Sequence, residues 1–172
     1  LKPLLKVVAL LRDKDRELFD RVRMVHVGSV NVENFDAILS EFELGQKFVS
    51  HGIQQREATI KILSESSLLY LGFSQPYGCW LVTGRIFDML VSGRPILAAA
   101  PKKSVVGGIL KELDSSCVFD ETSPDEAVSF LASLVRSHEK GEAVCRPRPE
   151  YARKYSSEKM VENIARVIKG VV

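Results

Sequence analysis

The chain has 172 residues, of which 45% are hydrophobic, and its 24 basic and 22 acidic side chains leave a net charge of +2. This length and apolar content suit one domain, 1–172, with a continuous core, and so small a charge gives no argument for a nucleic-acid partner. The three cysteines are far apart and have no histidine at ligand spacing, which argues against disulfides and against a metal site, and favours a reducing compartment.

Apolar runs in the chain stay well short of the roughly 20 residues that a membrane-spanning helix needs. We therefore expect a soluble, cytoplasmic protein. The chain begins at Leu1, already inside an amphipathic pattern and without an initiator methionine. We interpret it as a fragment of a longer protein.

The first half of the chain alternates between helical and extended patterns. Apolar residues recur every three or four positions in the helical segments, and short apolar runs that end in glycine predict strands. Asn31 is expected to cap one helix, and Gly45 to end it in the left-handed conformation. The expected elements are helices over 4–11, 14–21, 31–42 and 54–66, and strands over 23–28, 47–52 and 67–73.

The second half continues this alternation. A helix begins near Thr83 and ends at Gly93, and the strand that follows has no polar residue. Ser104 is expected to cap the next helix, and Ser123 a later one in which Pro124 takes the first helical position. The remaining expected elements are strands over 95–100 and 116–119, helices over 104–113 and 123–135, a linker over 139–149 and a closing helix over 156–171.

Strands without a polar face, separated by helices, are typical of a parallel sheet that is covered on both sides. The expected fold is therefore a doubly wound α/β domain, with helices on both faces of a mostly parallel, Rossmann-like sheet. In such domains ligands bind at the carboxyl ends of the strands. The site should then lie after Gly28, Gly52, Phe73 and Ala100.

The tripeptide Thr83-Gly84-Arg85 opens the helix that leads to Gly93. Amides of a first helical turn lack partners within the helix and lie at the positive end of its dipole, so they attract an anion. Thr83 can cap the helix or bond a phosphate oxygen, Gly84 allows close approach, and Arg85 adds charge, which suits a pyrophosphate. Asp88, one turn further, can accept hydrogen bonds from ribose hydroxyls. The alternative is an ordinary Thr-capped helix with solvated charges.

The run 76-PYGCWLVTGRIFDMLVSGRPILAAAP-101 resembles the donor-binding half of glycosyltransferases with the GT-B fold, of the family-four type. The resemblance is carried by its Thr-Gly-basic start, its Phe-Asp-x-Leu, its Ser-Gly-Arg-Pro-Ile-Leu ending and its place after 67-SLLYLGF-73. The segments 108-GILKELDSSCVFDETSPDEAV-128 and 155-YSSEKMVENIARVI-168 follow in the family's order, so the resemblance covers nearly the whole chain.

The resemblance implies that the chain binds a nucleoside-diphosphate sugar, with UDP or GDP as the nucleotide, while an amino-terminal domain of the same parent chain binds the acceptor. The parent would transfer a hexosyl group to a sugar, lipid or polysaccharide acceptor, and no metal or other cofactor is required. Thr83, Gly84 and Arg85 would meet the diphosphate, and Asp88 the ribose. The remaining residues assigned to the donor site are Gly52, Ile53, Gly78 and Trp80.

The chain departs from the family pattern at two of these positions. Many members carry two glutamates separated by seven residues, whereas this chain has Trp80 at the first position and Asp88 at the second. Aspartate reaches less far toward a ribose than glutamate, and an indole cannot accept hydrogen bonds as a carboxylate does. The family's first strand and glycine-rich loop are not visible before Leu1. We therefore expect the fragment to be inactive alone.

Other residues near the expected site have ordinary explanations as well as functional ones. His26 and His51 precede the two glycines, and a hydrogen-bonded structural role explains them more simply than a ligand contact. Lys102 and Lys103 either add positive field for a phosphate or are solvated. Cys79 would be a reactive thiol only if the helix start lowered its pKa.

The basic residues near the end of the chain either lie in solvent or face an anionic lipid surface, as peripheral contact with the inner face of a membrane would require. They are Arg146, Arg148, Arg153 and Lys154.

Two other functions stay open: half of a nucleotide-sugar epimerase, for which no catalytic acids are obvious, and a non-catalytic α/β module for nucleotide-sugar binding or signalling. A receiver-like module needs clustered acids after its first strand, where this chain has glycine.

Overall fold

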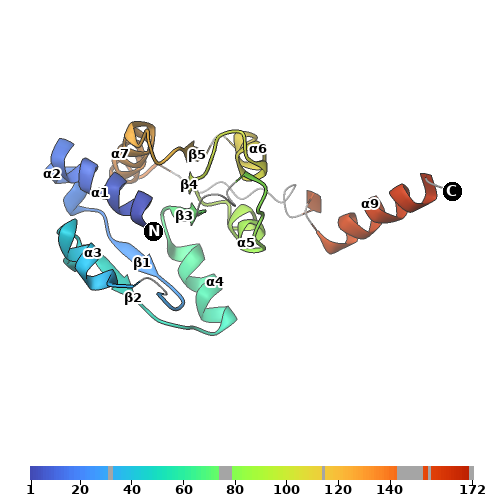
Figure 1. Cartoon of the computed structure of the whole chain (residues 1–172), viewed down its shortest axis with the longest axis horizontal. Helices are drawn as coiled ribbons and strands as arrows, with labels where there is room; N and C mark the ends of the chain where they lie inside the picture. Colours follow the sequence, from blue (N-terminus) through green and yellow to red (C-terminus); the bar gives the residue numbers. More distant parts are fainter. Residues whose placement is uncertain (31–32, 74–78, 114, 143–152, 155, 171–172) are drawn as a thin grey trace.

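The computed structural model describes the chain except for residues 31–32, 74–78, 114, 143–152, 155 and 171–172 (Figure 1). Its helices are α1 (Lys2–Lys14), α2 (Arg16–Asp20), α3 (Phe35–Glu41), α4 (Arg56–Glu65), α5 (Arg85–Ser92), α6 (Val105–Lys111), α7 (Asp125–Glu139) and α9 (Ser157–Gly170). The strands are β1 (Met24–His26), β2 (Phe48–Ser50), β3 (Leu69–Gly72), β4 (Ile96–Ala99) and β5 (Ser116–Phe119), and the 3-10 helix η1 (Gly45–Lys47) precedes β2.

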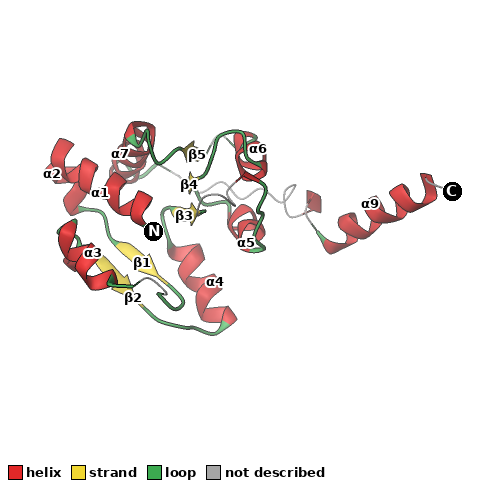
Figure 2. Cartoon of the chain, in the orientation of Figure 1, coloured by secondary structure: helices red, strands yellow, loops and turns green. Residues whose placement is uncertain are grey.

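These five strands form two parallel sheets in place of one. β1 pairs with β2, and β4 lies between β3 and β5. Figure 2 shows the two-stranded sheet between α3 and α4, apart from the three-stranded sheet. The chain is therefore an α/β protein with parallel strands, as expected, but its described residues do not form the single continuous sheet that we predicted. Strand pairing is a long-range property, which local hydrophobic patterns cannot specify.

Helices cover both faces of the three-stranded sheet. Side chains alternate along a strand, so Leu97 and Ala99 of β4 pack with α1 and α7, whereas Ile96 and Ala98 pack with α5 and α6. All four residues of β4 are buried, which explains the strand's unbroken apolar sequence. Because burial of each large side chain contributes about 1.5 to 3 kcal/mol, the packing of both faces of this sheet stabilises the fold.

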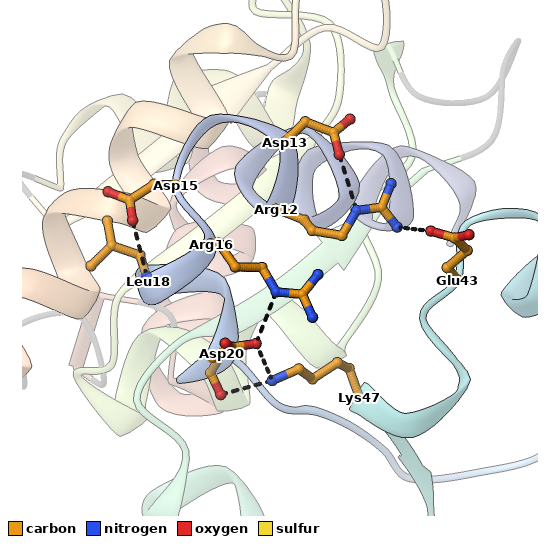
Figure 3. A network of polar contacts seen from close by, with 8 residues as sticks. All are labelled: Arg12, Asp13, Asp15, Arg16, Leu18, Asp20, Glu43 and Lys47. Atoms are coloured by element: carbon orange, nitrogen blue, oxygen red, sulfur yellow. Dashed lines mark hydrogen bonds and ion pairs between the residues drawn. The ribbon is translucent and has the colours of Figure 1, made fainter.

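Polar contacts tie α1 and α2 to the segment between α3 and β2 (Figure 3). The Arg12 guanidinium donates to the carboxylate of Glu43 at 3.0 Å, and Lys47 Nζ donates to the carbonyl of Asp20 at 2.7 Å. Exposed ion pairs contribute at most about 1 kcal/mol each. These contacts therefore position the two-stranded sheet beside α1 and α2 and add little to the core's stability.

The end of α3 differs from the prediction. Glu43, with φ 55°, takes the left-handed conformation that we assigned to Gly45, and Gly45 instead begins η1. The N–H of Leu44 donates to the carbonyl of Leu39 at 2.9 Å, which is the closing bond of a Schellman turn. Leu44 is fully buried. Burial of this leucine, which follows the left-handed residue, offsets the backbone cost of a left-handed glutamate.

The starts of α6, α7, α3 and α4 agree only in part with the prediction. The Ser104 hydroxyl accepts from the N–H of Gly107 at 3.0 Å, so the predicted cap of α6 is confirmed. At α7 the cap position is held by Pro124, so the assignment of Ser123 to the cap is wrong by one residue. Asn31 lies outside the described residues, and α3 begins later than predicted. The predicted helix 54–66 is present but shorter, since α4 spans Arg56–Glu65, and it has no buried residue.

The closing helix is present as predicted, and α9 extends away from the other elements (Figure 1). Five apolar residues on it are between 54 and 67% exposed: Met160, Val161, Ile164, Val167 and Ile168. Most of the predicted linker 139–149 lies outside the described residues, as do Arg146 and Arg148. None of the described helices combines the length and the apolar character that crossing a membrane demands.

Candidate functional site

The ends of β1 and β2 carry the glycines around which we expected the site. Gly28 has φ 121° and Gly52 has φ 64°, and the N–H of Gly28 donates to the carbonyl of Gly52 at 2.7 Å. The chain therefore leaves both strands at one edge of the two-stranded sheet. A Cβ added to Gly52, or to Gly84 at the start of α5, would meet no heavy atom within 4 Å beyond its chain neighbours in the described structure. Both glycines therefore border open space.

The start of α5 lies where the tripeptide predicted it, with Gly84 at the cap and Arg85 as the first residue. Thr83 does not cap the helix: its Oγ1 is buried and finds no hydrogen-bond partner among the described residues. The N–H groups of Ile86 and Phe87 donate to the carbonyls of Thr83 and Gly84, each at 3.1 Å. Two of the first-turn amides are thus already bonded, so attraction of an anion depends mainly on the dipole and on Arg85.

Arg85 lies within electrostatic range of the carboxyl end of β1. Burial lowers the pKa of His26, and the positive charge of Arg85 lowers the pKa further. The His26 ring stacks on Phe48, with ring centroids 6.1 Å apart. Its Nδ1 is buried and has no partner within the described chain, so the hydrogen-bonded role that we predicted for His26 is not seen at this atom.

Asp88 has a partner that the sequence did not reveal. Nη2 of Arg56, the first residue of α4, lies 3.7 Å from Oδ1 of Asp88, and the two side chains are 75% and 49% exposed. This distance is an ion-pair contact and exceeds that of a hydrogen bond. The pair joins the starts of α4 and α5, which puts Arg56 in the candidate site.

The residues assigned to the base and the sugar are exposed where they are described. Ile53 is 82% exposed and Trp80 66% exposed, whereas Gly78 lies outside the described residues. Lys102 contacts another element: its Nζ lies 2.8 and 2.6 Å from the carboxylate oxygens of Glu126, and this hydrogen bond raises the Lys102 pKa. Its charge is thereby offset by Glu126 on α7. Lys103 is exposed.

Two hollows of the structure lie away from these residues. One of about 370 Å³ is beside α3 and β2, and one of about 350 Å³ is between the start of α1 and β3. Neither is lined by Thr83, Arg85 or Asp88. The candidate site is therefore an open surface where the ends of β1 and β2 meet the starts of α4 and α5.

Neither models of known protein families nor curated proteins match this chain. In the part of the chain that the structure describes, no group of three or more histidine, cysteine, aspartate or glutamate side chains is placed to hold a metal ion. The chemistry of the candidate site therefore has to be argued from its own charges. These are the cations Arg85 and Arg56 and the carboxylate of Asp88.

Proposed function

We propose that this chain is the donor-binding domain of a glycosyltransferase with the GT-B fold, and that it binds a nucleoside-diphosphate sugar at the start of α5. A separate domain of the parent protein would bind the acceptor. In this proposal the two parallel sheets belong to one doubly wound sheet, which a further strand of the parent completes. The parent enzyme is proposed to be cytoplasmic and to transfer a hexosyl group to a sugar, lipid or polysaccharide acceptor.

One contact supports the proposal most directly: Nη2 of Arg56, at the start of the helix that follows β2, lies 3.7 Å from Oδ1 of Asp88 in the first turn of α5. The starts of α4 and α5 therefore border the same surface, and in α/β domains with parallel strands ligands bind where strands lead into helices. Gly52 and Gly84 leave open space on that surface. The surface thus has the access and the positive charge that a diphosphate requires.

The transfer reaction places negative charge on the leaving nucleoside diphosphate as the glycosidic bond breaks. A fixed cation and a helix dipole next to that diphosphate stabilise the charge without a metal ion. Arg85 would supply the cation, and the open space at Gly84 would let a phosphate oxygen approach the helix start. Asp88 would accept hydrogen bonds from the ribose, which orients the nucleotide.

A non-catalytic domain that binds a sugar nucleotide is the second candidate. It is favoured by the exposed Trp80, which stands where the resemblance would place a carboxylate. Both candidates share the nucleotide site and differ only in turnover. Sugar transfer by the full-length parent would therefore distinguish them, whereas nucleotide binding would not.

The first test is calorimetric titration of the chain with UDP, GDP and ADP. One nucleotide should bind, and Arg85→Ala should weaken its binding by about 1.5 to 3 kcal/mol, the usual cost of losing a hydrogen bond to a charged group. Asp88→Ala should weaken it by about 1 to 3 kcal/mol. The matched control is Arg23→Ala, because Arg23 is also exposed but precedes β1, at the opposite end of that strand.

The control variant should bind as the unaltered chain does. Equal losses in Arg23→Ala and Arg85→Ala would mean that net charge, and not the helix start, governs binding. If none of the three nucleotides bound either to the chain or to the full-length parent, the donor-site proposal would be wrong.

A further inference from the structure

Arg56 has no role in the proposal so far, although it contacts a residue of the proposed site. It begins α4 and lies across from the first turn of α5, with Nη2 3.7 Å from Oδ1 of Asp88. No described side chain donates a hydrogen bond to the carboxylate of Asp88. The contact with Arg56 is therefore purely electrostatic, and it leaves the hydrogen-bonding capacity of the carboxylate for a ligand.

The contact between Arg56 and Asp88 changes the net charge next to the proposed diphosphate site. Asp88 follows Arg85 by three residues, so the two side chains lie on neighbouring positions of one helix face. A diphosphate held by Arg85 would then lie about one helical turn from a carboxylate of the same sign, and like charges repel. Arg56 is the cation that ion-pairs with that carboxylate among the described residues. It offsets the repulsion from a position outside α5.

We propose that Arg56 is a positioning residue of the donor site, which offsets the charge of Asp88 so that Arg85 can bind the diphosphate. The inference rests on the proposed function, since it assigns a role within the same site. Arg56 acts through Asp88. Its effect should therefore depend on the ligand's phosphate charge and on the presence of the Asp88 carboxylate.

The test is a double-mutant cycle read by calorimetric titration. The variants are Arg56→Gln, Asp88→Asn and the two combined. Three ligands are titrated: the nucleoside diphosphate among UDP, GDP and ADP that binds the unaltered chain, the nucleoside of that nucleotide, and inorganic pyrophosphate. Exposed ion pairs contribute up to about 1 kcal/mol, so Arg56→Gln should weaken nucleoside-diphosphate binding by roughly 5-fold. Nucleoside binding should change by less than about 2-fold, because it lacks the phosphate charge.

Two features of the cycle separate this role from a structural one. Arg56→Gln should have no further effect when Asp88→Asn is already present, because no carboxylate is left to offset. Arg56→Lys should restore most of the affinity, because it keeps the charge. The matched control is Lys61→Gln: Lys61 is an exposed cation on the same helix and pairs with Glu65 at 3.9 Å.

Three results would overturn the inference. One is equal binding of the diphosphate by Arg56→Gln and Lys61→Gln, which would show that position 56 has no special role. Another is an equal loss for nucleoside and diphosphate that Arg56→Lys does not restore, which would indicate a structural effect. The third is that the unaltered chain binds none of the nucleotides. Of the three results, only this one would also count against the proposed function.

Discussion

Alanine at Gly107 and alanine at the adjacent Gly108 should change stability in opposite directions. A Cβ at Gly107 would lie 2.5 Å from the carbonyl oxygen of Lys102, whereas a Cβ at Gly108 would meet nothing within 4 Å. The obstructing atom at Gly107 belongs to the backbone of the turn between β4 and α6, so it cannot rotate away. Gly107 is buried and Gly108 is exposed. The two substitutions are therefore chemically identical but meet different surroundings.

The expected magnitudes follow from this geometry. Alanine gains up to about 1 kcal/mol over glycine inside a helix, and at Gly108 nothing opposes that gain. At Gly107 overpacking against the backbone costs about 1 to 3 kcal/mol, which exceeds the gain. We expect Gly108→Ala to stabilise the protein by about 0.5 to 1 kcal/mol and Gly107→Ala to destabilise it by about 1 to 2 kcal/mol.

Urea unfolding followed by circular dichroism measures both changes, provided that the slope of the free energy against urea is the same for both variants. A Gly107→Ala variant as stable as the unaltered chain would refute the close contact between α6 and the Lys102 turn. A destabilised Gly108→Ala variant would refute the open surroundings of that residue.

Two further predictions concern the core and the site. Leu97→Ala should cost about 2 to 5 kcal/mol in the same assay because Leu97 is fully buried, whereas Val91→Ala should cost far less because Val91 is 54% exposed; similar losses would contradict the packing of β4. The pKa of His26 is lower in the folded chain than in the unfolded chain, so as the pH drops below about 6.5 the unfolded chain is protonated at His26 before the folded chain. The free energy of unfolding should therefore fall below about pH 6.5. Arg85→Ala should raise the His26 pKa, measured by NMR titration, and an unchanged pKa would show that the two residues do not interact.

The sequence by itself predicted the order and type of most elements. Short-range physics is sufficient for this: Ser104 caps α6 through its own side chain, and Gly93, with φ 67°, ends α5 in the left-handed conformation. The apolar run 95–100 became a strand buried on both faces because it offers no polar side to solvent. The positive φ at Gly28 and Gly52 agrees with the residue type, since glycine adopts positive φ without steric cost.

The tertiary structure decided the features that depend on distant partners. Glu43 takes the left-handed turn in place of Gly45, and this arrangement places Leu44 in the core. Lys102 pairs with Glu126 of α7, and Asp88 pairs with Arg56 of α4. The division into two parallel sheets also depends on which distant segments pair. Local propensity acts over a few residues, whereas burial and charge pairing depend on which distant segments the folded chain brings together.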